Sequence, residues 1–525
     1  MHLSKRRSSS LDSKCIEIYD TTLRDGAQAT GIAFSLEDKL KITKKLDGFV
    51  DYIEGGWPSS NPKDLEYFKE VRKLKLGSKI SAFGSTMRVG LNPEDDINLK
   101  TLLQAADVIA IFGKSWGLHI KKVLGTTLSE NLRLIRESVN FLKQGGATVI
   151  YDAEHFFDGY IDDRKYALKT LDAAVSADVI VLCDTNGGKL PSEIFKIVQD
   201  VRKTITKPLG IHAHNDAGCA VANTLMAVEA GARHIQATVN GMGERAGNAD
   251  LTSVLPILRF KMGLTSINLK GLTQLSSFVY EIANVQNDPY QPYVGKYVFS
   301  HKGGIHVDAI LKNSQTYEHL DPSLVGNRRI TSVSEQSGKA SIVAKAAEFG
   351  LNLHKSDQKV ERILQTVKEY EKNGYKFENA EASLYLLMLL KLGLYKNPFD
   401  ITTWTTMIYS DGGKVIADST VTLKVGGKLI HTASQGNGPV HSLDLALRKA
   451  LKEFYPQAEK MKLTGYRVKE INVDAGTAAK VRVLIDFSND HRSWSTVGVS
   501  SNILEASRKA LIDGYRYFLL KEQGN

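Results

Sequence analysis

The chain has 525 residues with a hydrophobic fraction of 42% and a charged fraction of 24%, a composition typical of a folded protein of about three domains. Its net charge of +10 does not indicate a nucleic-acid partner, because the basic residues are scattered among acidic ones. No apolar run approaches the ~18 residues that span a bilayer, and three cysteines without a CxxC pair favour a reducing compartment, so we predict a cytoplasmic protein that binds neither nucleic acid nor membrane.

The first segment of the chain, residues 1–14, is rich in serine and in basic residues. It lacks the apolar stretch of a secretory signal, so we predict that it is a flexible tail. A peptide that targets an organelle is the alternative.

From residue 15 to about residue 244, a β-rich run, a polar loop and a helix-like segment recur. Strands that alternate with helices, such as those expected at 35–46 and 217–230, imply right-handed βαβ units and a parallel sheet. Eight β-rich runs are expected, at residues 15–23, 51–57, 79–86, 107–114, 148–156, 179–186, 209–216 and 234–244. They predict an α/β fold, a (β/α)8 TIM barrel that forms the catalytic domain over residues 15–263. A doubly wound open sheet is the alternative, but it would not need polar residues at the ends of so many strands.

Two histidines in the seventh expected strand, His212 and His214, lie two positions apart. Because alternate residues of a strand project to the same face, both imidazoles face one side, as ligands of a divalent ion would. Asp25 follows the first strand and brings a carboxylate to the same rim, a donor set that suits Mn²⁺, Mg²⁺ or Zn²⁺. Asn248 follows the last strand and is a candidate fourth ligand. The alternatives are an ordinary buried histidine pair and, for Asn248, a turn or cap residue.

Two charged residues at strand ends are candidates for catalysis. Arg24 is placed to stabilise negative charge that develops on a substrate oxygen, and its alternative role is an ion pair with Glu54 or Asp20. Glu154 ends the fifth strand between apolar and aromatic neighbours, so we predict acid–base work for it, with a surface glutamate as the alternative.

A glycine-rich loop, residues 241–248, follows the eighth expected strand. Its G-x-G-x-x-x-G spacing departs from the dinucleotide-binding G-x-G-x-x-G pattern, and no further unit of that kind follows. The backbone N–H groups around Gly241 and Gly243 remain candidates for contacting an anionic cofactor, such as a coenzyme that carries an acetyl thioester.

Beyond the barrel the pattern changes twice. Residues 264–397 are helix-rich and predict two small linking subdomains, and residues 398–525 alternate like strands. There the segment 446–451 (ALRKAL) recurs as 506–511 (ASRKAL), so we predict an α+β domain with a pseudo-twofold repeat. Such a domain suits effector pockets at the seams between repeats or subunits, and a plain dimerisation domain is the alternative.

Several motifs together resemble the 2-isopropylmalate synthase/homocitrate synthase family of the DRE-TIM metallolyases. They are residues 20–28 (DTTLRDGAQ), 212–216 (HAHND) and 243–248 (GERAGN). Five further segments are most similar to citramalate synthases, namely residues 51–64, 151–159, 183–188, 301–306 and 317–328. The likeness covers nearly the whole chain from residue 15 onward.

The resemblance implies that acetyl-CoA condenses with pyruvate to give (R)-citramalate and CoA, a step of isoleucine biosynthesis. It assigns the metal ligands as Asp25, His212, His214 and Asn248. It also implies that Arg24 holds the keto-acid oxygen and that Glu154 does acid–base work, while the keto acid is seated by Gln28 and Thr185 and the coenzyme is bordered by Glu244, Gly241 and Gly243.

In this family a region beyond the barrel completes the active site of the neighbouring subunit. The resemblance therefore implies a homodimer in which His306 and Tyr317 act as catalytic residues across the subunit interface. The C-terminal region resembles the amino-acid-sensing regulatory domain of isopropylmalate synthases, and isoleucine is the expected effector.

Three alternatives to this function stay open. One is a 2-isopropylmalate synthase that acts on 2-oxoisovalerate in leucine biosynthesis, because Asp152 occupies a position where some relatives carry an apolar or aromatic pocket residue. Another is a related acyl-CoA lyase or aldolase, although the last loop carries Glu244 and Arg245 and lacks the reactive cysteine of such lyases. The third is an inactive sensor, which the intact Arg24, Asp25 and histidine set disfavours.

Overall fold

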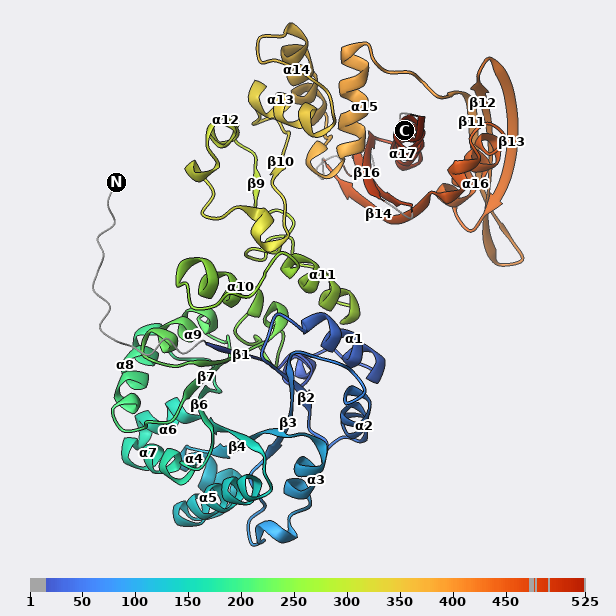
Figure 1. Ribbon diagram of the computed structural model, residues 1–525. Coiled ribbons are helices and arrows are strands. Elements are labelled where there is room, and N and C mark those ends of the chain that lie inside the picture. Colours follow the sequence, from blue (N-terminus) through green and yellow to red (C-terminus); the bar gives the residue numbers. More distant parts are fainter. Residues whose placement is uncertain (1–15, 472–475, 477–478, 490–491, 524–525) are drawn as a thin grey trace. The chain divides into compact units, whose positions relative to one another are not determined.

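The computed structural model describes residues 16–471, 476, 479–489 and 492–523, so the predicted tail at 1–14 and Cys15 lie outside the described residues. The chain divides into two compact units (Figure 1). The first unit comprises Met1–Phe299 and Asp321–Arg328, and the second comprises Ser300–Leu320 and Arg329–Asn525.

The first unit is a closed barrel of parallel strands, which confirms the predicted TIM barrel (Figure 1). Its strands are β1 (Glu17–Asp20), β2 (Tyr52–Gly56), β3 (Lys79–Ser85), β4 (Val108–Lys114), β5 (Thr148–Glu154), β6 (Val179–Asp184), β7 (Leu209–Ala213) and β8 (His234–Ala237). Each strand pairs with the next, and β8 pairs with β1 to close the sheet. Every strand therefore points its carboxyl end at the same face, where the connecting loops converge.

Helices surround this barrel and cover its outer face (Figure 1). They are α1 (Leu36–Leu46), α2 (Pro62–Val71), α3 (Ile97–Ala105), α4 (Gly117–His119), α5 (Leu128–Gln144), α6 (Phe156–Asp162), α7 (Arg164–Ala173), α8 (Pro191–Arg202), α9 (Ala220–Glu229), α10 (Leu251–Pro256) and α11 (Leu272–Ile282). Local sequence sets their ends: Ser35 and Asp38 form a capping box at the start of α1, a device worth about 1 kcal/mol.

The interior of the barrel is packed with side chains. Its core consists of Tyr19, Tyr52, Phe83, Val108, Ala110, Ile150, Val179, Val181 and Cys183, with Trp57 and Phe112 partly buried against it. Strands such as β6 are buried on both faces, so their sequence is a continuous apolar run without alternation. The filled interior confines the candidate polar residues to the carboxyl ends of the strands.

The second unit begins with small elements and helices, as predicted for the linking region. They are β9 (Ser300–His301), α12 (Gly304–Lys312), β10 (Ile330–Thr331), α13 (Lys339–Glu348), α14 (Gln358–Lys372) and α15 (Glu381–Leu392). The parallel pairing of β9 with β10 was not predicted. Within the described part of the chain, no helix is both long and apolar enough to cross a membrane.

The C-terminal part of this unit contains two copies of a three-strand-plus-helix motif, which confirms the predicted α+β pseudo-repeat. The first copy is β11 (Asp400–Asp411), β12 (Lys414–Val425), β13 (Lys428–Gly436) and α16 (Pro439–Leu451). The second is β14 (Lys462–Glu470), β15 (Val481–Ser488), β16 (Ser493–Ser500) and α17 (Ile503–Gln523). Both sheets are antiparallel, and one apolar core joins the two copies through residues such as Val421, Leu447, Ile485 and Leu511.

Candidate metal-dependent active site

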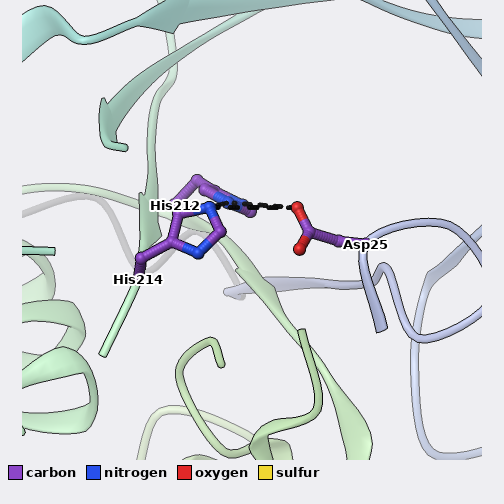
Figure 2. Close-up of side chains that lie close together, drawn as sticks. All are labelled: Asp25, His212 and His214. Carbon is purple, nitrogen blue, oxygen red and sulfur yellow. Dashed lines mark hydrogen bonds and ion pairs between the residues drawn. The ribbon is translucent and has the colours of Figure 1, made fainter. Parts of the chain in front are cut away.

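Asp25, His212 and His214 meet at the carboxyl end of the barrel (Figure 2). His212 lies in β7, His214 follows that strand, and Asp25 lies in the loop after β1. The Nε2 atoms of the two imidazoles are 3.3 Å apart, and they lie 3.7 and 4.0 Å from Oδ2 of Asp25. The structure therefore brings together the three strongest sequence candidates, with their donor atoms facing one another.

The protonation states of this cluster suit metal binding. Burial lowers the pKa of His212 to about 3 and also lowers the pKa of His214, so both imidazoles are neutral at neutral pH. Burial opposes ionisation of Asp25, yet the pKa of Asp25 lies well below its usual range, and the adjacent Arg24 guanidinium is the largest influence that lowers it. The cluster thus offers one carboxylate and two neutral nitrogen donors.

The surroundings of the cluster also fit a divalent ion. One donor atom from each of the three residues lies within 4.8 Å of the others. Asn248 donates from Nδ2 to Oδ1 of Asp25 at 2.8 Å, and its own Oδ1 is buried without a hydrogen-bond partner. A carboxylate, two imidazoles and an amide oxygen form a set that first-row divalent metals accept. Asn248 as a fourth ligand stays a prediction.

Glycines in the loop after β8 allow Asn248 to reach this position. A Cβ atom at Gly243 would lie 2.1 Å from Nδ2 of Asn248 and 3.2 Å from Oδ1 of Asp25, so only glycine allows this approach. Gly241 donates its N–H to Thr238 and accepts from the N–H of Asn248 at 2.9 Å, which folds the loop back on itself. The predicted contacts of Gly241 and Gly243 with a coenzyme stay predictions.

Arg24 is held rigidly at the edge of the cluster. Its Nε donates to Glu54 at 2.6 Å, its Nη1 donates to Asp25 at 2.8 Å, and its guanidinium carbon lies 3.8 Å from the centre of the Phe83 ring. The alternative predicted for Arg24, an ion pair with Glu54, is therefore present. It does not exclude the catalytic role, because a fixed guanidinium is preorganised for a developing charge.

A cavity of about 220 Å³ opens beside the cluster. Its lining includes the predicted Arg24, Gln28, Glu154, Thr185 and Glu244, together with Asp152. One wall consists of three aromatic side chains that were not predicted as site residues, Trp57, Phe83 and Phe112. Phe83 and Phe112 stack at 5.4 Å between ring centres, and Trp57 meets both edge-on. Trp57 ends an expected strand, which was the available signal for it, whereas Phe83 and Phe112 lie inside expected strands.

Glu154 projects into this cavity from the end of β5 and pairs with Lys114 at the end of β4. The next residue, His155, has a positive φ of 54° and donates its N–H to Oγ1 of Thr185 at 2.9 Å. A non-glycine residue rarely adopts this conformation, which concentrates at functional sites. Lys114 was not predicted, although it is the last residue of its strand.

His306 and Tyr317 belong to the second compact unit. His306 lies in α12, and the two rings are 4.2 Å apart between centres. Both side chains are exposed. The structure therefore brings these two candidates together with each other, and a role for them in catalysis stays a prediction.

Comparisons with known proteins agree along nearly the whole chain. The HMGL-like family matches residues 15–279, the homocitrate synthase post-HMGL domain-like family matches 293–374, and the LeuA allosteric (dimerisation) domain matches 378–519. The (R)-citramalate synthase of Geobacter sulfurreducens is 50% identical, covering 97% of this chain and 98% of that protein. The (R)-citramalate synthase of Aquifex aeolicus is 49% identical with the same coverage. The 2-isopropylmalate synthase of Methanocaldococcus jannaschii is 30% identical over 97% of this chain and 95% of that protein.

Proposed function

This chain belongs to the (R)-citramalate synthases of the HMGL-like family, and on that premise we propose that it condenses acetyl-CoA with pyruvate to give (R)-citramalate and CoA. A carbon–carbon bond forms between the methyl carbon of the acetyl group and the ketone carbon of pyruvate, and water then hydrolyses the thioester. The observation that carries the proposal is the Asp25, His212 and His214 cluster beside Arg24 at the mouth of the barrel.

The cluster supplies the site for a divalent cation. Asp25, His212 and His214, with Asn248 as a fourth ligand, would hold Mn²⁺, Mg²⁺ or Zn²⁺, which when bound polarises the ketone of a 2-oxo acid. Arg24 lies 2.8 Å from Asp25, so a ketone oxygen at this site is within reach of its guanidinium. Because Glu54 and Phe83 fix the guanidinium in advance, no reorganisation is needed as negative charge develops on that oxygen.

Proton transfer is assigned to Glu154. The methyl group of acetyl-CoA must lose a proton before it attacks, and the ketone oxygen of pyruvate must gain one. Glu154 lines the same cavity as Arg24, and its pairing with Lys114 keeps its side chain in place. A carboxylate so placed can act as a general base or acid once the substrates fill the cavity.

The aromatic wall of the cavity supports the proposal that the enzyme prefers pyruvate to keto acids with larger side chains. Gln28 and Thr185 line the cavity and would seat the keto acid, while Trp57, Phe83 and Phe112 would occupy the space that a branched side chain needs. A hydrophobic pocket typically discriminates one added methylene by about 1–3 kcal/mol. We therefore assign the preference for a methyl side chain to this wall and the coenzyme border to Glu244, Gly241 and Gly243.

The remaining proposals concern the subunits, the effector and the cellular compartment. The enzyme acts as a homodimer in which His306 and Tyr317 complete the active site of the neighbouring subunit. The match of residues 378–519 to an allosteric dimerisation domain supports regulation by an amino acid, for which we propose isoleucine. The unpaired Cys183 and Cys219 are consistent with action in the cytoplasm.

The test is a thiol-release assay with acetyl-CoA and three keto acids, pyruvate, 2-oxoisovalerate and 2-oxoglutarate, run before and after removal of metal by a chelator. We expect pyruvate to give at least a tenfold higher kcat/KM than either alternative, consistent with the discrimination that a hydrophobic pocket can supply. Activity should disappear on chelation and return with Mn²⁺, Mg²⁺ or Zn²⁺. Preference for 2-oxoisovalerate would instead identify a 2-isopropylmalate synthase, and undiminished activity without metal would contradict the proposed chemistry.

A further inference from the structure

A pair of buried polar residues lies behind the proposed metal site, inside the barrel. Gln236 is in β8 and Asp152 is in β5, and Nε2 of Gln236 donates to Oδ1 of Asp152 at 2.9 Å across the interior. Resting on the metal site proposed above, we propose that Gln236, held by Asp152, is the positioning residue that orients the imidazole of His212 toward the metal.

The strand register places Gln236 directly beside His212. The two residues are paired neighbours in the parallel β7–β8 ladder, so their side chains project to the same face of the sheet. His212 belongs to the cluster at the barrel mouth, so this face is the barrel interior. Gln236 is 1% exposed, Asp152 is 4% exposed and His212 is 6% exposed, so these side chains have little access to solvent.

If His212 binds a metal through Nε2, its other ring nitrogen, Nδ1, needs a hydrogen-bond acceptor. Nε2 faces Asp25 and His214, so it must carry the lone pair if it is to bind a metal, and the proton of the neutral ring must sit on Nδ1. That Nδ1 is buried and has no hydrogen-bond partner among the described residues. A metal-binding histidine almost always donates this proton to an acceptor that fixes its tautomer.

Gln236 offers the matching acceptor. Its Oε1 is also buried and has no hydrogen-bond partner among the described residues. Two unsatisfied buried groups on neighbouring strands therefore complete one another.

Asp152 determines which end of the amide faces the histidine. Because Nε2 of Gln236 is occupied by Oδ1 of Asp152, only Oε1 remains for Nδ1 of His212. With the amide reversed, an N–H would face Nδ1, the ring proton would move to Nε2, and the metal would lose this ligand. Asp152 thus acts on the metal site through Gln236.

Metal affinity of the full-length protein tests this inference independently of the condensation reaction. The probes are Zn²⁺, measured by competition with a chromogenic chelator, and Co²⁺, measured by its visible absorption. Gln236→Met keeps the shape of the side chain but removes the acceptor, and we expect it to weaken Zn²⁺ binding by about 10–100-fold and to change the Co²⁺ spectrum. Gln236→Glu restores an acceptor oxygen and should recover most of the affinity.

A second pair of variants serves if Gln236→Met fails to fold. Asp152→Asn keeps an oxygen that accepts from Gln236 and should bind Zn²⁺ as the unaltered protein does, whereas Asp152→Leu should bind it less tightly. A purely structural role would lower Tm in Gln236→Met and Asp152→Leu without changing the metal affinity of the folded fraction, and this result would overturn the inference. If the condensation assay fails while the affinities follow this pattern, only the proposed reaction is lost.

Discussion

Arg24 shows how neighbouring residues can fix the position of one side chain. Its guanidinium donates to Glu54 and Asp25 and stacks on Phe83, so both its position and its plane are fixed. A lysine ammonium at this position would keep the charge but lose the planar fork and the stacking surface. The contacts therefore predict that Arg24 and lysine are not interchangeable here.

We expect Arg24→Lys to lower kcat by roughly 10²–10³-fold, the usual loss when a donor to a developing oxyanion is removed. The measurement is steady-state thiol release with pyruvate and acetyl-CoA at saturating metal. Zn²⁺ affinity serves as the control and should change little, because Arg24 is not a ligand. A variant that keeps most of its turnover would show that Arg24 does not stabilise the transition state.

His214 is predicted to act only through the metal. It is buried beside Asp25, with its Nε2 directed at the other donor atoms. We expect His214→Ala to lose tight Zn²⁺ binding and metal-dependent turnover while keeping the circular dichroism spectrum of a folded barrel. The matched control is His234→Ala, since His234 is equally buried in β8 but pairs with Glu17. Equal loss of metal from both variants would point to general damage instead.

The buried carboxyl group of Asp152 leads to a prediction about how the stability of the protein depends on pH. Burial, reinforced by the nearby negative charge of Glu54, raises the pKa of Asp152 to about 8, whereas an unfolded aspartate titrates near 4. Between these values the folded protein holds a proton that the unfolded chain has released, so stability falls as pH rises through this window and levels off above it. Asparagine cannot ionise and removes this dependence.

The free energy of unfolding of the metal-free protein should therefore fall between pH 5 and 8 relative to that of Asp152→Asn, by up to roughly 1 kcal/mol per pH unit. Urea unfolding of both proteins across this range measures the difference. Asp20, whose pKa burial raises to about 7, contributes equally to both curves and cancels. Parallel curves would mean that Asp152 is already ionised in the folded state.

At this scale the sequence indicated the charged residues of the site but not its walls. Asp25, His212 and Arg24 stand out because a polar side chain at the end of an apolar strand needs a reason to be there. Phe83 and Phe112 do not stand out, because an aromatic residue in a barrel strand looks like core in any sequence. Their role depends on the cavity beside them, which forms only when distant strands come together.

At the scale of elements, the eight barrel strands were predicted correctly, but several of their carboxyl ends were not. The expected run 234–244 ends as a strand at Ala237, and the run 15–23 ends at Asp20. Strands buried on both faces have no alternation that marks where they stop. The true ends depend on contacts such as the hydrogen bonds from Thr22 to Asp20, which turn the chain away from the sheet.

The close packing of Gly243, in the loop after β8, leads to a further prediction. Because a Cβ atom at Gly243 would clash with Nδ2 of Asn248, Gly243→Ala must displace the Asn248 side chain from its position at the proposed metal site. We expect at least a tenfold loss of Zn²⁺ affinity, comparable to other perturbations of a ligand's support. Gly188→Ala is the matched control, since a Cβ atom at Gly188 meets nothing within 4 Å. Unchanged affinity in Gly243→Ala would argue against Asn248 as a ligand.

At the scale of the whole molecule, the internal repeat was readable because both copies kept similar helix sequences. The packing of the last repeat against the linking helices could not be predicted from the sequence. Val497 and Val499 of β16 share an apolar core with α13–α15, so the linking helices and the last repeat are joined within the second unit. A boundary drawn at residue 398 from the change in sequence pattern passes through structure that this core holds together.

The regulatory role of the last domain leads to a prediction about removing it. If the isoleucine site lies in residues 398–525, the truncated protein must lose isoleucine inhibition, whatever happens to its basal rate. The loss of Val497 and Val499 also exposes the core of α13–α15, which should cost roughly 3–6 kcal/mol and lower Tm.

Thiol release with and without isoleucine, alongside thermal unfolding, measures both effects on the truncated protein. Leucine in place of isoleucine is the ligand control and should leave the full-length enzyme uninhibited. Inhibition by isoleucine that survives the truncation would place the effector site in the barrel or the linking helices. Because inhibition is a ratio of rates within one preparation, a fall in stability alone cannot imitate its loss as long as a measurable fraction stays folded.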